Sequence, residues 1–175
     1  SISFTLKTSV FYTGNPSVVA GDVALSAADG VYTLSPTESV EVKATGIHKE
    51  VSSMLGSGAF DDAFVVTRPI DLLHIAEQVN AGNNTYRTAS YVLAADIDCG
   101  GEELQVIGDL RNEEAFFSGC FTCVTNSETG EMERYSIKNF TINSTDKNYV
   151  GLFGCVQADL TTQSSGLFYG IRLED

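Results

Sequence analysis

The second half of the chain repeats short apolar strands of three or four residues, each followed by a bend. Gly151-Leu152-Phe153-Gly154 closes most of this run, and Gly166-Leu167-Phe168-Tyr169-Gly170 repeats its pattern. Short strands at such regular spacing are typical of a sandwich, or of a solenoid in which every coil contributes several strands. The internal repeat favours the solenoid. Strands are predicted at Tyr91-Val92-Leu93, Asp96-Ile97-Asp98, Val106-Ile107-Gly108, Phe117-Ser118-Gly119, Tyr135-Ser136-Ile137, Phe140-Thr141-Ile142, Tyr149-Val150-Gly151 and Leu167-Phe168-Tyr169.

One helix is predicted immediately before this run, over residues 69–81. Pro69 suits the first helical position, and Gly82 is placed to end the helix at its C′ site. An apolar stripe at helical spacing must cover something, so we expect this helix to close one end of the strand stack. The stripe comprises Leu72, Leu73, Ala76, Val79 and Asn80.

The first part of the chain, residues 1–46, has the alternation of a small antiparallel β-module that resembles a sandwich. Apolar residues alternate with polar ones around Phe4, Val23 and Val42, and about five short strands are expected. Asp29-Gly30 is suited to a tight hairpin turn between residues 23–25 and 31–34, because both turn positions need positive φ. Gly, Ser and scattered charges over residues 47–63 predict a linker.

Residues 64 to 173 resemble the GLUG-motif repeat family of bacterial surface proteins. The resemblance rests on the order and spacing of several short elements. They are Val79-Asn80-Ala81-Gly82, Tyr91-x-Leu93, Asp96-Ile97-Asp98, Ile107-Gly108, Phe117-Ser118-Gly119-Cys120-Phe121, Ile137-Lys138-Asn139-Phe140-Thr141-Ile142 and Val150-Gly151-Leu152-Phe153-Gly154. The acidic module in front is similar to the small immunoglobulin-like domains of bacterial surface proteins.

This resemblance implies a right-handed parallel β-helix on a secreted or wall-attached protein, in which Asp96, Asp98, Gly108, Gly119 and the residues of 151–154 are scaffold. Members of the family are often adhesins or stalk segments, and some are attached to immunoglobulin-cleaving peptidases. The chain departs from the pattern at two places. Gln105-Val106 stands where the family has a Trp before Ile-Gly, and Thr122-Cys123 replaces a glycine.

The charge of the chain excludes several classes of partner. Ten basic and 23 acidic residues give a net charge of −13, which repels nucleic acid and anionic lipid surfaces. No apolar stretch is long enough for a membrane span. The family resemblance implies an extracellular module, secreted or at a bacterial cell surface, that forms part of a longer chain. The sequence contains no motif for a cofactor, a metal or a catalytic nucleophile.

Asp96 and Asp98 are the strongest candidates for a chemical site. In a strand both carboxylates project from one face, an arrangement that binds calcium or performs acid–base catalysis. The alternative is a turn in which the aspartate oxygens accept backbone N–H bonds at a corner of the stack. With Asp109, these residues would serve an accessory domain of a polysaccharide- or peptide-cleaving enzyme.

All four cysteines lie in the second region. An exported protein is expected to oxidise some of its thiols, and Cys99 stacked on Cys120 is the favoured pair. Buried free thiols that act as small apolar side chains are the alternative. The other two cysteines are Cys123 and Cys155.

Two loops, residues 100–115 and 123–134, interrupt the strand pattern most. Binding residues are often found in loops on a rigid scaffold. The main hypothesis is a non-enzymatic module that binds a host protein, such as an immunoglobulin, or a glycan through these loops. The alternative is a structural spacer that provides reach and rigidity and binds no partner. Candidate binding residues are Phe116, Phe117, Tyr135, Glu113 and Glu114.

Overall fold

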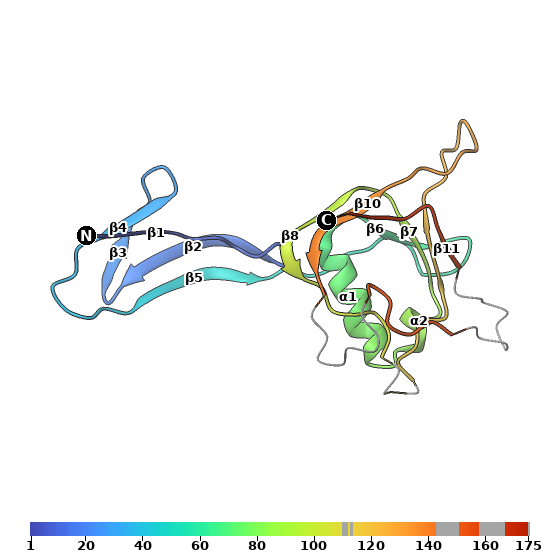
Figure 1. Ribbon diagram of the computed structural model, residues 1–175, viewed down its shortest axis with the longest axis horizontal. Coiled ribbons are helices and arrows are strands. Elements are labelled where there is room, and N and C mark those ends of the chain that lie inside the picture. Colours follow the sequence, from blue (N-terminus) through green and yellow to red (C-terminus); the bar gives the residue numbers. More distant parts are fainter. Residues whose placement is uncertain (110–111, 113, 143–150, 158–166, 175) are drawn as a thin grey trace. The chain divides into compact units, whose positions relative to one another are not determined.

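The chain folds into two compact units, Ser1–Glu50 and Val51–Asp175. The computed structural model describes every residue except 110, 111, 113, 143–150, 158–166 and 175 (Figure 1). The segment predicted as a linker, 47–63, is divided between the units. Its first residues belong to a strand of the first unit, whereas the Leu55 carbonyl accepts a hydrogen bond from Val65 in the second.

The first unit contains five strands in two antiparallel sheets: β1 (Ile2–Thr5), β2 (Tyr12–Ala20), β3 (Val23–Leu25), β4 (Val31–Leu34) and β5 (Val42–Lys49). One sheet pairs β1 with β4, and the other has the order β3-β2-β5. The predicted antiparallel β-module is therefore present. Its buried apolar residues are few, namely Phe11, Val18 and Ala20.

Asp29 and Gly30 form the tight turn that the sequence predicts, but this turn does not connect a β3–β4 hairpin. Both residues have positive φ, 51° and 78°, and they close a bridge between Ala28 and Val31. β3 pairs with β2, and β4 pairs with β1. The residues of the turn thus predicted its local conformation correctly, but the predicted pairing of residues 23–25 with residues 31–34 was wrong.

In its described residues, the second unit contains two helices and two parallel sheets. The helices are α1 (Pro69–Asn80) and α2 (Asn84–Arg87). One sheet has the order β11-β9-β7-β6, and the other has the order β12-β10-β8. Parallel sheets and a mainly β composition confirm the predicted fold class at this level. The strands are β6 (Phe64–Val66), β7 (Ser90–Leu93), β8 (Ile97–Glu103), β9 (Cys120–Cys123), β10 (Ser136–Thr141), β11 (Leu167–Tyr169) and β12 (Arg172–Glu174).

Residues that are paired across neighbouring parallel strands form continuous rows of side chains. In the four-stranded sheet the pairing places Phe64 beside Tyr91, Tyr91 beside Phe121, and Phe121 beside Phe168. The ring centroids of Phe64 and Tyr91 are 5.6 Å apart, and those of Tyr91 and Phe121 are 5.7 Å apart. Aromatic pairs at such distances stabilise a core beyond the area they bury. Phe117, fully buried, contacts Tyr91 and Phe168 from the side.

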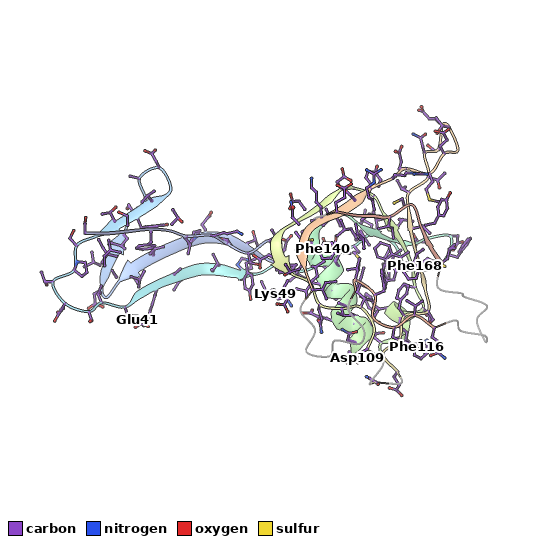
Figure 2. All side chains as sticks on the ribbon, viewed as in Figure 1. Glu41, Lys49, Asp109, Phe116, Phe140 and Phe168 are labelled. Carbon is purple, nitrogen blue, oxygen red and sulfur yellow. The ribbon has the colours of Figure 1, made fainter. Side chains whose placement is uncertain are left out.

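An aliphatic row forms the corresponding core of the three-stranded sheet. Ile97 pairs with Ile137, and Ile137 pairs with Leu173. Ile97 and Ile137 are buried, whereas Leu173 is 53% exposed. The aromatic row ends in the same way, because Phe168, labelled in Figure 2, is 37% exposed. Both rows therefore run from a buried end to an exposed last strand.

Helix α1 begins where the sequence predicts and ends one residue earlier, with Ala81 as its C-cap. Asp71 accepts hydrogen bonds from the backbone N–H groups of Thr67 and Arg68, and Gly82 follows the C-cap with φ 75°. The negative charge of Asp71 also stabilises the helix, because the N-terminal end of the helix dipole is positive. The buried face is shifted from the predicted stripe, since Leu73 is only half-buried. It comprises Ile70, Asp71, Leu72, Ile75, Ala76 and Val79.

Residues 151–154 pack against residues 106–108 through paired backbone groups. Ile107 N–H donates to the Leu152 carbonyl, and Gly154 N–H donates to the Ile107 carbonyl, both at 2.9 Å. A Cβ atom on Gly154 would lie 2.7 Å from the carbonyl oxygen of Gly108, so the two backbones approach too closely for any side chain. The same holds for Gly119 against the carbonyl of Ala89.

These contacts give the predicted scaffold residues a packing role. Leu152 is buried, and Phe153 is half-buried with its ring against Phe117 and Phe168. Gly151 differs, because a Cβ atom there would meet only the Phe153 carbonyl oxygen, at 3.4 Å. Neither helix of the described chain has the length and apolar composition that crossing a membrane requires.

Candidate functional site

The loop between β9 and β10 folds as a narrow hairpin that projects from the second unit (Figure 1). Thr125 and Met132 form an antiparallel bridge, and Asn126 N–H donates to the Glu131 carbonyl at 2.8 Å. Glu133 N–H donates to the Val124 carbonyl at 2.9 Å. The segment predicted as an irregular loop is thus a hydrogen-bonded arm.

Asn126 holds the tip of this hairpin in a defined conformation. Its side-chain oxygen accepts hydrogen bonds from the backbone N–H groups of Glu128 and Thr129, at 2.9 and 3.2 Å. Its amide group donates to a Glu133 carboxylate oxygen at 3.2 Å. An Asn side chain that replaces backbone partners in this way stabilises a turn locally. The tip is therefore pre-shaped.

A hollow lies at the base of the hairpin, between residues 131–134 and 169–172. It has two overlapping lobes of about 270 and 310 Å³, which share Arg134, Tyr169 and Gly170. Arg172 lines the first lobe, and Glu131 lines the second. Two arginines and one tyrosine are thus among the residues that line the first lobe.

Parallel strand pairing brings the two arginines together. β12 pairs with β10 so that Arg172 is opposite Ser136, and Arg172 N–H donates to the Tyr135 carbonyl at 3.1 Å. Gly170, with φ 81°, turns the chain against the hairpin base. A Cβ atom there would lie 3.1 Å from the Met132 sulfur. A side chain at position 170 would therefore crowd Met132 and Cys123, and its positive φ favours glycine.

The predicted binding residues have different fates. Phe117 is wrong as a surface anchor, because it is fully buried in the aromatic core. Phe116 is half-buried, and the guanidinium carbon of Arg87 covers its ring at 4.4 Å from the centroid. Tyr135 is half-buried beside the hollow, and Glu114 is exposed on the other long loop. Glu113 lies outside the described residues.

Asp96 and Asp98 are exposed on β8 and its approach, but their carboxylates are engaged within the chain. Asp96 accepts hydrogen bonds from the backbone N–H and the hydroxyl of Ser136, at 2.7 and 3.1 Å. Asp98 accepts bonds from Gly100 N–H at 2.9 Å and from the Asn139 amide at 3.0 Å to each oxygen. These contacts favour the structural alternative over a calcium or acid–base site.

The same hydrogen bonds explain the ionisation of the two carboxyl groups. The backbone N–H of Ser136, followed by its hydroxyl, lowers the pKa of Asp96. The Asn139 amide, followed by Gly100 N–H, lowers the pKa of Asp98. Both groups are therefore firmly ionised near neutral pH, which is unfavourable for a general acid. In the described part of the chain no three His, Cys, Asp or Glu side chains are grouped as metal ligands.

The preferred pairing of Cys99 with Cys120 is wrong. Cys99 lies in β8 of the three-stranded sheet, whereas Cys120 lies in β9 of the other sheet, beside Ser90 and Leu167. All four cysteines are free thiols. Burial, with a smaller contribution from Asp98, raises the pKa of Cys99 to about 11. Burial and then Asp109 raise the pKa of Cys155.

Sequence reasoning identified the 123–134 loop and Tyr135 but missed Arg134, Tyr169 and Arg172. No local motif marks these residues, because Arg134 lies at the end of the hairpin, Tyr169 in β11 and Arg172 in β12, and strand pairing brings these segments together. Comparison of the chain with protein-family models, with curated proteins and with solved structures yields no match.

Proposed function

We propose that the chain is a non-enzymatic binding module of a secreted or surface-attached bacterial protein. In this proposal the second unit is a short right-handed parallel β-helix of the GLUG type, with α1 covering its upstream end. The scaffold displays the 124–134 hairpin and the hollow beneath it to an extracellular partner.

The stacked rows support the solenoid part of this proposal. Phe64, Tyr91, Phe121 and Phe168 occupy one position on four successive strands of a parallel sheet. A matching aliphatic row runs through the other sheet. Repetition of one position on stacked parallel strands is the packing principle of a solenoid, in which each coil buries its faces against the next.

The observation that carries the binding role is the hollow with Arg134, Arg172 and Tyr169 beneath a pre-shaped hairpin. Arginine and tyrosine are enriched where proteins bind partners, because both combine a large contact area with polar groups. The alternative enzymatic role has less support. Its candidate carboxylates, Asp96 and Asp98, are occupied by internal hydrogen bonds.

The proposal is tested with the full chain and immobilised host glycoproteins. Biolayer interferometry would compare the wild-type chain with a variant in which residues 125–132 are replaced by Asn-Gly, a two-residue hairpin turn. Mucin and immunoglobulin serve as the two probes. We expect saturable binding to at least one probe, and loss of that binding in the shortened variant.

A thermal unfolding curve that matches the wild type would show that the shortened variant retains its fold. A second variant, with Gly-Ser inserted after Phe60, controls for loop editing elsewhere in the same unit, since Phe60 is 87% exposed. Absence of binding to both probes, or equal binding by the shortened variant, would favour the spacer instead.

A further inference from the structure

The cationic side chains of the hollow are unusual for this chain. The chain contains only ten basic residues against 23 acidic ones, yet two of the ten line one concave surface. Within the part of the chain that the structure describes, the Arg134 side chain forms no ion pair and donates no hydrogen bond. The guanidinium group of an arginine carries five N–H donors, and no described residue of the chain occupies those of Arg134.

Arg172 contributes a second donor group. Its Nη1 atom contacts a Glu174 oxygen at 3.3 Å, and its side chain is 61% exposed. One contact through Nη1 leaves the other guanidinium N–H groups available, since the guanidinium fork carries five. Exposed ion pairs of this kind contribute little free energy, so a ligand carboxylate competes with Glu174 at small cost.

The surroundings favour a single carboxylate over a polyanion. Glu131 lines the second lobe, Glu174 adjoins the first, and the chain as a whole carries −13 charges. Phosphorylated or polysulfated ligands would meet these charges at close range. A ligand with one negative group and several hydroxyls fits better, because the Glu131 carboxylate accepts hydrogen bonds from hydroxyl donors.

Tyr169 adds an apolar face to the same hollow. It is 57% exposed, although it belongs to a strand, and it lines both lobes. Aromatic side chains combined with a few placed polar groups recur in small-ligand sites. The C–H groups on one face of a pyranose ring pack against such a surface. The lobe volumes, about 270 and 310 Å³, are at the small end for ligand sites.

We infer that the hollow binds the carboxylate of an acidic sugar, such as a terminal sialic or uronic acid of a glycan, between Arg134 and Arg172, with the sugar ring against Tyr169. This inference rests on the proposed binding function and names its ligand class. The backbone contacts of Gly170 and Arg172 position these groups before the ligand arrives.

Protein NMR titration of the full chain provides the direct test. The probes are N-acetylneuraminic acid, glucuronic acid, glucose and acetate. We expect both acidic sugars to shift backbone resonances of residues 131–134 and 169–172. Glucose and acetate should each bind at least about tenfold more weakly, because each lacks half of the recognised groups. Equal binding of glucose and glucuronic acid, or shifts confined to other residues, would overturn the inference.

Three variants separate a specific site from general charge. Arg134→Gln and Arg172→Gln should each weaken acidic-sugar binding by about tenfold or more, the effect of losing a charge-assisted hydrogen bond. Lys43→Gln removes one positive charge from the first unit, where Lys43 is exposed, and should leave affinity within about twofold. Full affinity in both arginine variants would refute the site.

Desialylated mucin distinguishes failure of this inference from failure of the proposed function. Binding to native mucin that is lost after sialidase treatment supports the acidic-sugar site. Binding that survives the treatment, with no response to the free acidic sugars, retains the binding module and rejects the acidic-sugar site. Absence of all binding rejects both.

Discussion

The side chain of Asn80, the last residue of α1, hydrogen-bonds to the backbone of residues 106–108 as a neighbouring strand would. The Asn80 side-chain oxygen accepts from Gly108 N–H, and its amide group donates to the Val106 carbonyl, both at 2.8 Å. One side chain thereby satisfies two backbone groups that would otherwise lack partners at this bend. The contact fixes the 106–108 segment against which residues 151–154 pack.

Replacement of Asn80 with Ala is therefore expected to destabilise the second unit by about 1–3 kcal/mol. The substitution would leave the Gly108 N–H group and the Val106 carbonyl group without a hydrogen-bond partner in a largely buried place. Urea unfolding followed by circular dichroism measures the change. Asn84→Ala is the matched control, because Asn84 is exposed and should give a change within about 0.5 kcal/mol. Equal effects of the two substitutions would contradict the proposed clamp.

Gly154→Ala tests the close approach of the two backbones. The added methyl group would lie 2.5 Å from a methyl carbon of Val106 and 2.7 Å from the Gly108 carbonyl oxygen. Overpacking of this kind costs about 1–3 kcal/mol. Gly151→Ala, three residues earlier in the same motif, should be tolerated, because its nearest contact is at 3.4 Å. The difference in thermal midpoint between the two variants is the measurement, and a similar loss in both would argue against the packing role.

The pattern of short apolar segments predicted β7, β8 and β11, because strand periodicity is a local property. Two predicted strands are wrong, since residues 106–108 and 117–119 form only isolated bridges at Ile107 and Phe117. The segments 135–137 and 140–142, predicted as two strands, are covered by the single strand β10, and residues 149 and 150 lie outside the described residues. Which strands pair is a long-range property, and there the sequence was less informative. The Asp29-Gly30 turn has its predicted geometry, yet β3 and β4 pair elsewhere. Adjacent Phe116 and Phe117 also show this limit, since alternation places them on opposite faces without saying which face is the core.

The candidate site was less predictable than the fold for the same reason. Arg134 and Arg172 meet because β10 and β12 are parallel and in register. Nothing in either local sequence encodes that register. The exposure of Asp96 and Asp98 was compatible with a chemical role, and only the position of Ser136 and Asn139 on the neighbouring strand identifies the carboxylates as structural.

The stability of the second unit should depend on pH through Asp96 and Asp98. Their pKa values are lowered in the folded chain by hydrogen bonds to Ser136 and Asn139, relative to an ordinary 3.8. A lowered pKa contributes stability above the unfolded value, and this contribution is lost as pH falls through the folded value. Wild-type stability should therefore decline below about pH 4.

Asp98→Asn isolates one of these contributions. The variant should be less stable than the wild type at about pH 6, and the difference should shrink at about pH 3, where the wild-type carboxylate gains a proton. Asp61→Asn, at an exposed position of the same unit, controls for net charge. Urea midpoints at the two pH values give the comparison. A difference that stays constant with pH would show that Asp98 acts by shape alone.

Cys99 and Cys120, which lie in different sheets, should differ in their rates of alkylation. Cys99 is buried, and its pKa is raised to about 11, so almost none of it is thiolate at about pH 8. Cys120 is half-buried in the other sheet. Iodoacetamide should therefore modify Cys120 well before Cys99 in the native chain, and the rates should converge after denaturation. Mass spectrometry of the digested protein reads both sites. Recovery of a Cys99–Cys120 linked peptide without reductant would contradict the structure, because parallel pairing places the two residues in separate sheets.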